Sequence, residues 1–237
     1  MFSTDISPDR KSIFVSRRLN TLNPVLITLN SLGYHLIHEA LIKTSPIRFT
    51  HTPATQWIFF PGRDAIRYFF SQQPDVKPNV KFGVVSDVSA EYLGNFGHEA
   101  SFIGKGVDVV QIGKDFAKFI KDDSVLIPQA IDSMQIIQKQ LAFTNSCHNL
   151  FVYKTQFRDD FYEFPSDVLA FTSPSNVQAY FQKYKLAPNQ KVIAVGSTTV
   201  LKLKEYKIKD IVLSPGFDES SLLNSLMELI DPRRVYH

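Results

Sequence analysis

The chemistry that this sequence offers lies in turns rich in serine and threonine rather than in acid–base pairs or metal ligands. Thr172–Asn176 (TSPSN) follows a short apolar run and precedes aromatic residues at helical spacing, which is typical of a buried strand that turns into a helix. Ser173 is placed to cap this helix, and Pro174 suits its first position. Such a turn presents backbone N–H groups and the positive end of a helix dipole, which favours anion binding.

Two more turns of this kind follow later predicted strands, at Gly196–Thr199 and Ser214–Gly216. Because ligands of open α/β sheets bind at the carboxyl ends of strands, we expect all three turns on one rim. Their N–H and hydroxyl groups suit carboxylates or phosphates. Ordinary helix capping remains the alternative for any single turn. The rim residues expected to bind an anion are Thr172, Ser173, Ser175, Ser197, Thr198, Thr199 and Ser214.

Three residues outside that rim are further candidates. Arg63 begins a predicted helix and can hold a carboxylate bidentately, although a solvated arginine fits the same position. Ser89 lies in a turn that matches the Gly196–Thr199 turn. Tyr153 lies in an extended stretch between the two expected domains, where it could also be an ordinary strand aromatic.

Known cofactor and metal motifs are missing from the sequence. It contains neither GxGxxG, GxxxxGK[ST] nor HExxH. His35 and His38 would face opposite sides of a predicted strand, and the adjacent Cys147 and His148 do not form an oriented nucleophile pair. Asp159 and Asp160 fit a solvated loop. We therefore expect no cofactor and no metal.

Composition indicates a folded protein that receives a small polyanion. The 237 residues are 44% hydrophobic and 13% aromatic, with a net charge of +3, which is too low to suggest nucleic-acid binding. Cys147 is the single cysteine, which favours a reducing compartment. Met1–Ser12 is polar and shows no apolar signal region, and no apolar run is long enough to span a membrane. The expected location is cytoplasmic.

Strands and helices alternate along the whole chain, which predicts parallel sheets covered by helices. The expected strands are 12–15, 34–39, 57–60, 81–85, 98–103, 124–127, 148–155, 167–171, 191–195 and 210–213, with residues 41–50 an edge strand or linker. The expected helices lie at 24–32, after Arg63, and at 88–96, 115–120, 132–143, 174–184, 200–206 and 219–230.

The chain also repeats itself. Ile58–Ile66 resembles Leu169–Val177 at an offset of 111 residues, and Lys81–Ser89 resembles Lys191–Thr199 at an offset of 110. Two similar α/β domains explain these matches, although any two strand–turn–helix units share some likeness. Extended stretches flank the first copy, which suggests that it is inserted into the second. The expected boundaries are 1–41 plus 158–237 for domain 1, 49–149 for domain 2, and 42–48 and 150–157 for two linker strands, with a cleft between the domains.

Short motifs in a fixed order resemble the uroporphyrinogen-III synthase family over nearly the whole chain. The matching stretches are Leu126–Ala130 (L-I-P-x-[AG]), Val152–Thr155 (V-Y-x-T), Phe171–Val177 (F-T-S-P-S-[AN]-V), Ala194–Thr199 (A-[IV]-G-x-T-[TA]) and Ser214–Leu222. The first copy departs from the pattern. Pro61–Ile66 stands where relatives carry T-S-[KR]-N-A-V, and Val85–Ala90 where they carry V-G-x-x-T-A, so hydroxyl contacts from Pro61 and Gly62 are not expected.

The resemblance implies two flavodoxin-like α/β domains joined by a two-stranded linker, and catalysis without a cofactor. The family cyclises hydroxymethylbilane to uroporphyrinogen III in tetrapyrrole (heme) biosynthesis. The substrate loses its hydroxyl to give an azafulvene, and ring D then closes through a spiro intermediate and becomes inverted. Because this substrate carries eight carboxylates, turn amides and hydroxyls can hold it.

The resemblance also suggests roles for single residues. Tyr153 would assist hydroxyl departure as a hydrogen-bond donor, and the hydroxyls of the rim would bind carboxylates. Domain closure about the two linkers is a further expectation. We expect a monomer that binds hydroxymethylbilane, contacts the preceding pathway enzyme only transiently, and binds neither nucleic acid nor membrane.

Two other functions fit parts of the sequence. A non-catalytic two-domain binder of an anionic small molecule would have the same turns. A protein–protein scaffold could use Tyr68, Phe69 and Phe70, although their helical spacing favours a core.

Overall fold

The computed structural model describes residues 11–141 and 146–230. The chain forms two compact units: unit 1 consists of Met1–Ile42 and Phe157–His237, and unit 2 of Lys43–Gln156. The chain passes between them twice, once in β3 (Ile42–Pro46) and once in β8 (Cys147–Phe157), which are hydrogen-bonded neighbours. Most of the N-terminal stretch expected to lack a signal region lies outside the described residues.

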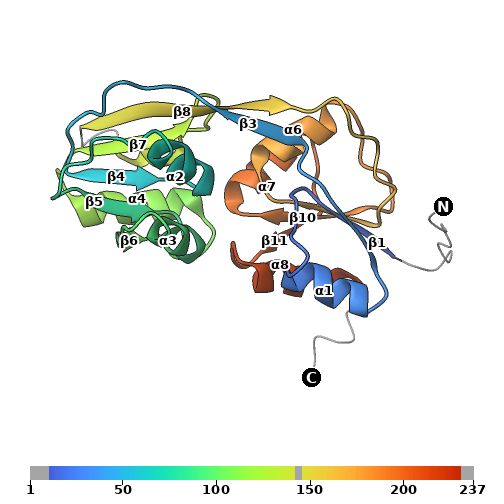
Figure 1. Cartoon of the computed structure of the whole chain (residues 1–237). Coiled ribbons are helices and arrows are strands. Elements are labelled where there is room, and N and C mark those ends of the chain that lie inside the picture. Colours follow the sequence, from blue (N-terminus) through green and yellow to red (C-terminus); the bar gives the residue numbers. More distant parts are fainter. Residues whose placement is uncertain (1–10, 142–145, 231–237) are drawn as a thin grey trace. The chain divides into compact units, whose positions relative to one another are not determined.

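Unit 1 is a parallel sheet in the order β11-β10-β9-β1-β2 (Figure 1). Numbered within the unit, this order is 2-1-3-4-5, the flavodoxin-like arrangement. The N-terminal strand β1 pairs directly with β9, which joins the two separate parts of the unit. Its elements are β1 (Ser12–Val15), α1 (Pro24–Ser31), β2 (His35–His38), β9 (Val168–Phe171), α6 (Pro174–Phe181), β10 (Lys191–Val195), α7 (Ser197–Glu205), β11 (Ile211–Ser214) and α8 (Glu219–Ile230).

Helices cover both faces of this sheet because its strands are apolar on both sides. Ile13 and Val15 pack with α1 and α8 on one face, whereas Phe14 between them packs with α6 and α7 on the other. Phe14 is fully buried and stacks on Phe164 with ring centroids 4.1 Å apart. Packing on both faces fixes the positions of the strands and therefore of the residues at their ends.

Unit 2 is a six-stranded sheet in the order β3-β8-β7-β4-β5-β6, parallel at every pairing from β8 to β6. Helices α4 and α5 cover one face, and α2 and α3 cover the other. Its remaining elements are β4 (Trp57–Phe60), α2 (Arg63–Phe70), β5 (Lys81–Val84), α3 (Asp87–Gly94), β6 (Ala100–Ile103), α4 (Val109–Ile120), β7 (Val125–Ala130) and α5 (Ile136–Leu141).

The two units share one sheet arrangement with a different chain order. Strands β11-β10-β9-β1-β2 of unit 1 correspond in position to β6-β5-β4-β7-β8 of unit 2, which is a circular permutation. Ile58–Ile66 and Leu169–Val177 therefore occupy equivalent places, as do Lys81–Ser89 and Lys191–Thr199. The repeat predicted from the sequence is confirmed in the topology of the sheets.

Three helices begin three or more residues away from their predicted starts, and helix α6 ends at Phe181 rather than at residue 184. Helix α4 starts at Val109 rather than at residue 115, because Asp108 caps it by accepting from the N–H groups of Val110 and Gln111. Helix α5 begins at Ile136, four residues later than predicted, and its predicted end at residue 143 lies outside the described part of the chain. Helix α7 begins at Ser197 rather than at residue 200.

Candidate functional site

The candidate anion site is the carboxyl edge of the unit 1 sheet. Since all pairings are parallel, β1, β9, β10 and β11 end on the same edge. They lead there into Ser16, Thr172, Gly196 and Ser214–Gly216. The three predicted turns therefore share one rim of the sheet, where α/β proteins bind ligands.

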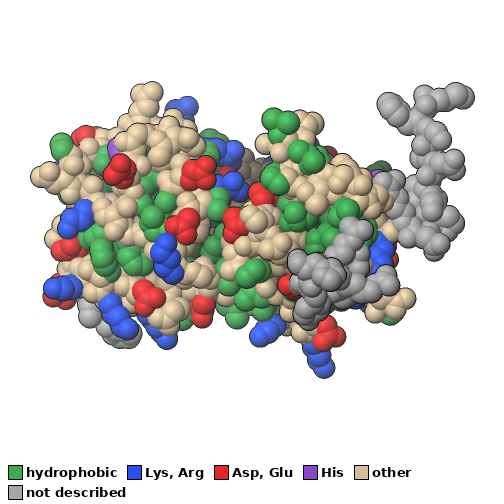
Figure 2. Space-filling view, turned by 90° about the horizontal axis from the view of Figure 1, so that it is seen from below, with side chains coloured by type: hydrophobic (Ala, Val, Ile, Leu, Met, Phe, Trp, Pro, Cys, Tyr) green, Lys and Arg blue, Asp and Glu red, His purple; other side chains and the backbone are tan. Residues whose placement is uncertain are grey.

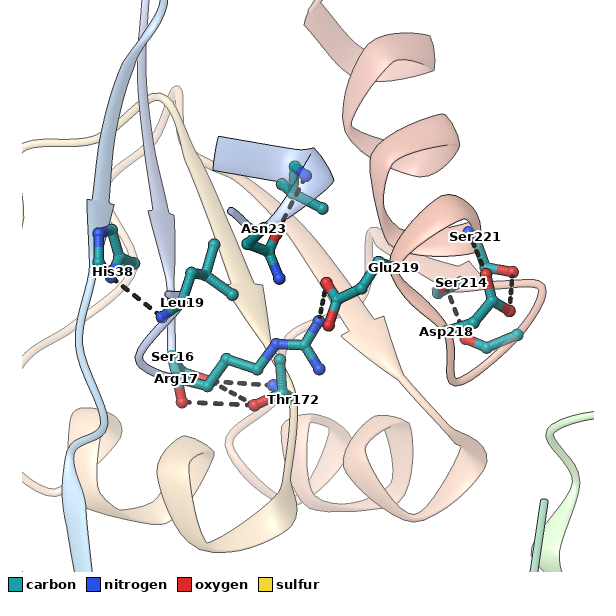
Figure 3. Close-up of polar contacts among 12 residues, drawn as sticks. Ser16, Arg17, Leu19, Asn23, His38, Thr172, Ser214, Asp218, Glu219 and Ser221 are labelled. Carbon is teal, nitrogen blue, oxygen red and sulfur yellow. Dashed lines mark hydrogen bonds and ion pairs between the residues drawn. The ribbon is translucent and has the colours of Figure 1, made fainter. Parts of the chain in front are cut away.

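The centre of this rim is the topological switch point between β1 and β9, from which the chain leaves in opposite directions. Here the Thr172 N–H donates to Ser16 Oγ at 2.9 Å, and the two hydroxyl oxygens lie 3.3 Å apart (Figure 3). Thr172 Oγ1 also lies 3.3 Å from the Ser16 carbonyl oxygen. Thr172 thus ties the two strands together, while its side chain remains partly exposed.

The turn into α6 has the predicted geometry. Ser173 is the N-cap, and its Oγ accepts from the Asn176 N–H at 3.3 Å. Pro174 occupies the first helical position. Ser173 and Ser175 are both partly exposed, so their side chains can contact a ligand.

The turn into α7 depends on a glycine. Gly196 has a φ of +82°, and a Cβ at this residue would lie 2.8 Å from the Phe217 ring. Helix α7 therefore begins without a side-chain cap. Ser197 and Thr198, in its first turn, are partly exposed, so this helix start is open to an external anion.

Three predicted binding hydroxyls do not face solvent. Ser89, Thr199 and Ser214 are buried, with exposed fractions of 3%, 1% and 0%. Thr199 Oγ1 donates to the Val195 carbonyl at 2.8 Å, and Ser214 Oγ donates to the Gly216 carbonyl at 3.0 Å. Ser89 Oγ lies 3.3 Å from Ser86 Oγ, inside the turn. These hydroxyls stabilise their own turns, and we leave them out of the proposed binding set.

In unit 2, Tyr153 lies beside the carboxyl end of β7. Its carbonyl accepts from the Ile131 N–H at 3.0 Å. The β7–β8 register shifts here, with Gln129 opposite Phe151 but Ala130 opposite Tyr153. This irregularity places the Tyr153 side chain with α2 and α3, on the same face as Val152.

The surroundings of Tyr153 keep its phenol protonated. Burial raises the pKa of Tyr153, and the negative charges of Asp64 and Asp132 raise it further, against an opposing effect of Arg67. Its ring stacks on Tyr68 with centroids 5.2 Å apart. A neutral, oriented phenol is a hydrogen-bond donor rather than a base.

Comparison with known proteins gives a clear assignment. Residues 26–224 match the family model described as uroporphyrinogen-III synthase HemD. The chain belongs to the uroporphyrinogen-III synthase family. It is thus a cyclising lyase of heme and other tetrapyrrole biosynthesis, and the resemblance drawn from the short motifs is confirmed. A search of curated protein sequences finds no match.

Solved structures of uroporphyrinogen-III synthases share the fold at low sequence identity. The Helicobacter pylori enzyme is 16% identical with a TM-score of 0.61, and the comparison covers 93% of this chain and 99% of that one. A mutant of the Thermus thermophilus enzyme is 14% identical with a TM-score of 0.59, over 92% and 98% of the two chains. The two-unit α/β architecture is therefore that of uroporphyrinogen-III synthases.

Sequence reasoning missed two arginines of this synthase rim, although Ser16-Arg17-Arg18 directly follows a predicted strand. Arg17 lies across the rim and forms an ion pair with Glu219 at the start of α8, with an N–O distance of 2.5 Å (Figure 3). Arg18 is exposed and has no hydrogen bond or ion pair within the described ranges. Its guanidinium is therefore free to pair with a carboxylate of a ligand.

The start of α2 supplies a second exposed arginine. Arg63 lies at the first helical position behind Gly62, and this helix also has no side-chain cap. Among described residues, Arg63 has no hydrogen-bond or ion-pair partner. The structure thus leaves its predicted contact with a carboxylate sterically open.

The other reactive residues of the synthase have structural environments. His38 Nδ1 accepts from the Leu19 N–H at 3.1 Å, and burial raises the pKa of the Cys147 thiol to about 11, which makes it a poor nucleophile.

Within residues 11–141 and 146–230, no group of three or more metal-binding side chains is found. No described helix is long and apolar enough to cross a bilayer. On the face drawn in Figure 2, basic and acidic side chains are interspersed rather than gathered by sign.

Proposed function

We propose that this synthase closes hydroxymethylbilane without a cofactor, inverts ring D through a spiro intermediate, and binds the substrate carboxylates at the unit 1 rim. The observation that carries the proposal is the convergence of exposed donors on that rim. Ser173, Ser175 and Thr198 are partly exposed at helix starts, and Arg18 is exposed at the end of β1. N–H, O–H and guanidinium donors fit a ligand that carries carboxylates on every ring.

In the first chemical step the substrate's C–O bond breaks, and the pyrrole electrons form an azafulvene as the hydroxyl departs. Loss of the pyrrole N–H proton balances the step, so that the hydroxyl leaves as water, and a hydrogen bond to the departing oxygen helps the C–O bond to break. Tyr153 is suited to this role because burial and two nearby carboxylates keep its phenol protonated. We propose that Tyr153 donates a hydrogen bond to this oxygen.

The remaining steps depend on positioning. Ring D attacks the azafulvene through its substituted carbon, and the spiro intermediate fragments and closes again. Uncatalysed closure gives the type I isomer without inversion, so the enzyme must lower one transition state relative to a competing one. Carboxylates held at several fixed donors restrict the conformations of the chain and supply this selection.

Other expectations accompany the proposal and stay predictions. They are a cytoplasmic monomer, transient contact with the preceding pathway enzyme, no binding to nucleic acid or membrane, and movement about β3 and β8 on ligand binding. Small-angle scattering with and without the porphyrinogen product tests the last of these, and identical curves would argue against it.

The decisive experiment supplies purified protein with freshly generated hydroxymethylbilane and separates the porphyrin isomers after oxidation. We expect type III product above the spontaneous type I background. Type I product alone, at the rate seen without protein, would refute the proposed reaction. If such a protein still bound uroporphyrin, the alternative of a non-catalytic anion binder would replace it.

A further inference from the structure

Asn176 forms a buried hydrogen-bond network behind the Ser173 turn. Its side chain is 4% exposed. Oδ1 accepts from the backbone N–H of Leu41 at 2.8 Å, and Nδ2 contacts Ser173 Oγ at 2.8 Å. The backbone N–H of Asn176 also donates to Ser173 Oγ, at 3.3 Å. One residue thus contacts both the capping serine and the segment that leads into β3.

Hydrogen-bond chemistry fixes the direction of each of these bonds. The Leu41 N–H can only donate, so the oxygen of the Asn176 amide must face it, and the NH₂ group must face Ser173. Since that NH₂ group can only donate, Ser173 Oγ accepts from it and from the backbone N–H as well. Both lone pairs of the hydroxyl are then engaged.

The proton of the Ser173 hydroxyl is the part of this group that is not yet used in a hydrogen bond. It has no acceptor within the part of the chain that the structure describes, and Ser173 is partly exposed. A serine that caps a helix with one N–H could still accept a further hydrogen bond, whereas this serine can only donate. A carboxylate, which only accepts, is the matching ligand.

We propose that Asn176 is a positioning residue that holds the Ser173 hydroxyl as a hydrogen-bond donor for a substrate carboxylate. The inference rests on the proposed function and assigns Asn176 no contact with the substrate. A purely structural role, in which Asn176 only anchors Leu41, would affect folding but not substrate affinity through Ser173. The two roles are therefore separable.

The test is Asn176→Asp, which has nearly the same shape. An aspartate still accepts from the Leu41 N–H, but its second oxygen accepts the Ser173 proton instead of donating to Ser173 Oγ. We expect KM for hydroxymethylbilane to rise about tenfold, which corresponds to about 1.4 kcal/mol, with kcat within about twofold. Tm should fall by about a few degrees, because the new carboxylate is buried. The control is Asn189→Asp, which adds the same charge at an exposed position of unit 1 and should leave KM within about twofold.

A double variant shows whether the effect passes through Ser173. In a Ser173→Ala background, Asn176→Asp should raise KM by much less than it does in the wild-type enzyme. Equal factors in both backgrounds, or an unchanged KM in the folded single variant, would overturn the inference. The alanine background also separates the added charge, whose repulsion of substrate persists there, from the lost donor.

A binding measurement separates this inference from the proposed function. Fluorescence titration with uroporphyrin III, a stable carboxylated porphyrin, should show weaker binding to the Asn176→Asp protein than to the wild type. If the wild type forms type III product and the variant binds and turns over normally, only the inference fails. If the wild type forms no type III product, the proposed reaction fails, and the titration still tests Asn176.

Discussion

Replacement of Tyr153 by phenylalanine removes the proposed hydrogen bond to the departing oxygen and leaves the packing of unit 2 in place. Tyr153→Phe removes one hydroxyl and keeps the ring that stacks on Tyr68, with centroids 5.2 Å apart. The backbone bond from the Ile131 N–H to the Tyr153 carbonyl is unaffected. We therefore expect the free energy of unfolding to change by less than about 1 kcal/mol.

The expected loss of activity is much larger. Tyr153 is partly exposed, and burial raises the pKa of its phenol, so its proton is retained and its hydrogen bond to a departing oxygen is less screened than in bulk water. Removal of a donor that acts on developing charge in such a site costs roughly 10²–10³ in kcat, or about 2.7–4 kcal/mol. The contact forms as the C–O bond breaks, and KM should change by less than about threefold.

The pKa also predicts a pH dependence. A raised folded-state pKa means that the neutral phenol stabilises the fold fully below the unfolded value of about 10, and that this contribution is lost as pH rises through the folded-state pKa. Activity should therefore show no alkaline decline due to Tyr153 up to about pH 9. A decline between pH 7 and 9 that Tyr153→Phe abolishes would contradict this assignment.

The assay is the rate of type III formation, with type I as an internal measure of spontaneous closure. Tyr184→Phe is the matched control, since the Tyr184 hydroxyl donates to the Phe161 carbonyl at 3.2 Å in unit 1. We expect this variant to be less stable by about 1 kcal/mol and to retain wild-type activity. A Tyr153→Phe enzyme with wild-type turnover would remove Tyr153 from the chemistry.

Three further variants test other parts of the structure. Arg18→Ala should raise KM about two- to fivefold, an effect that weakens with added salt, and leave Tm unchanged because Arg18 is exposed. Hydrogen bonds from Ser221 lower the pKa of Asp218. Its carboxylate therefore stabilises the fold above about pH 4, and this contribution is lost as pH falls through the lowered pKa. Asp218→Asn should lower the unfolding free energy by about 1 kcal/mol at pH 7 and flatten the acid limb of a pH–stability curve. Gly83→Ala should lower the unfolding free energy by about 1–3 kcal/mol, because the added Cβ would lie 2.8 Å from the Phe59 ring.

The sequence predicts the elements well where a strong pattern has clear ends. β4, β10 and α8 have the predicted bounds, since apolar runs or helical spacing begin and end there beside turn residues. Helix α4 is the counterexample. Its first half follows Gly104-Lys105-Gly106, which resembles a loop, and the cap at Asp108 is recognisable only once the helix is known.

The candidate site was predicted less completely, because turn residues alone do not show which way a hydroxyl points. Ser173 and Thr199 both lie near helix starts. Ser173 accepts hydrogen bonds at the partly exposed cap, whereas Thr199 donates backward to the Val195 carbonyl and is buried. The strand pairing also decides the position of Tyr153. The shift between Gln129 and Ala130 depends on β7, so β8 alone could not reveal on which face the tyrosine lies.

The circular permutation bears on the divergent first copy. Helix α2 corresponds in position to α6, yet Gly62 replaces the capping serine, so the hydroxyl contacts of the second copy have no equivalent there. Because α2 has no side-chain cap, the first N–H groups of this helix are available to an external acceptor, and such groups can bind an anion. Arg63 at the first position adds a cation that a hydroxyl could not supply. We therefore expect the first copy to bind a carboxylate through these N–H groups and Arg63 rather than through hydroxyls, and Arg63→Ala is expected to weaken substrate affinity more than substitution of Pro61.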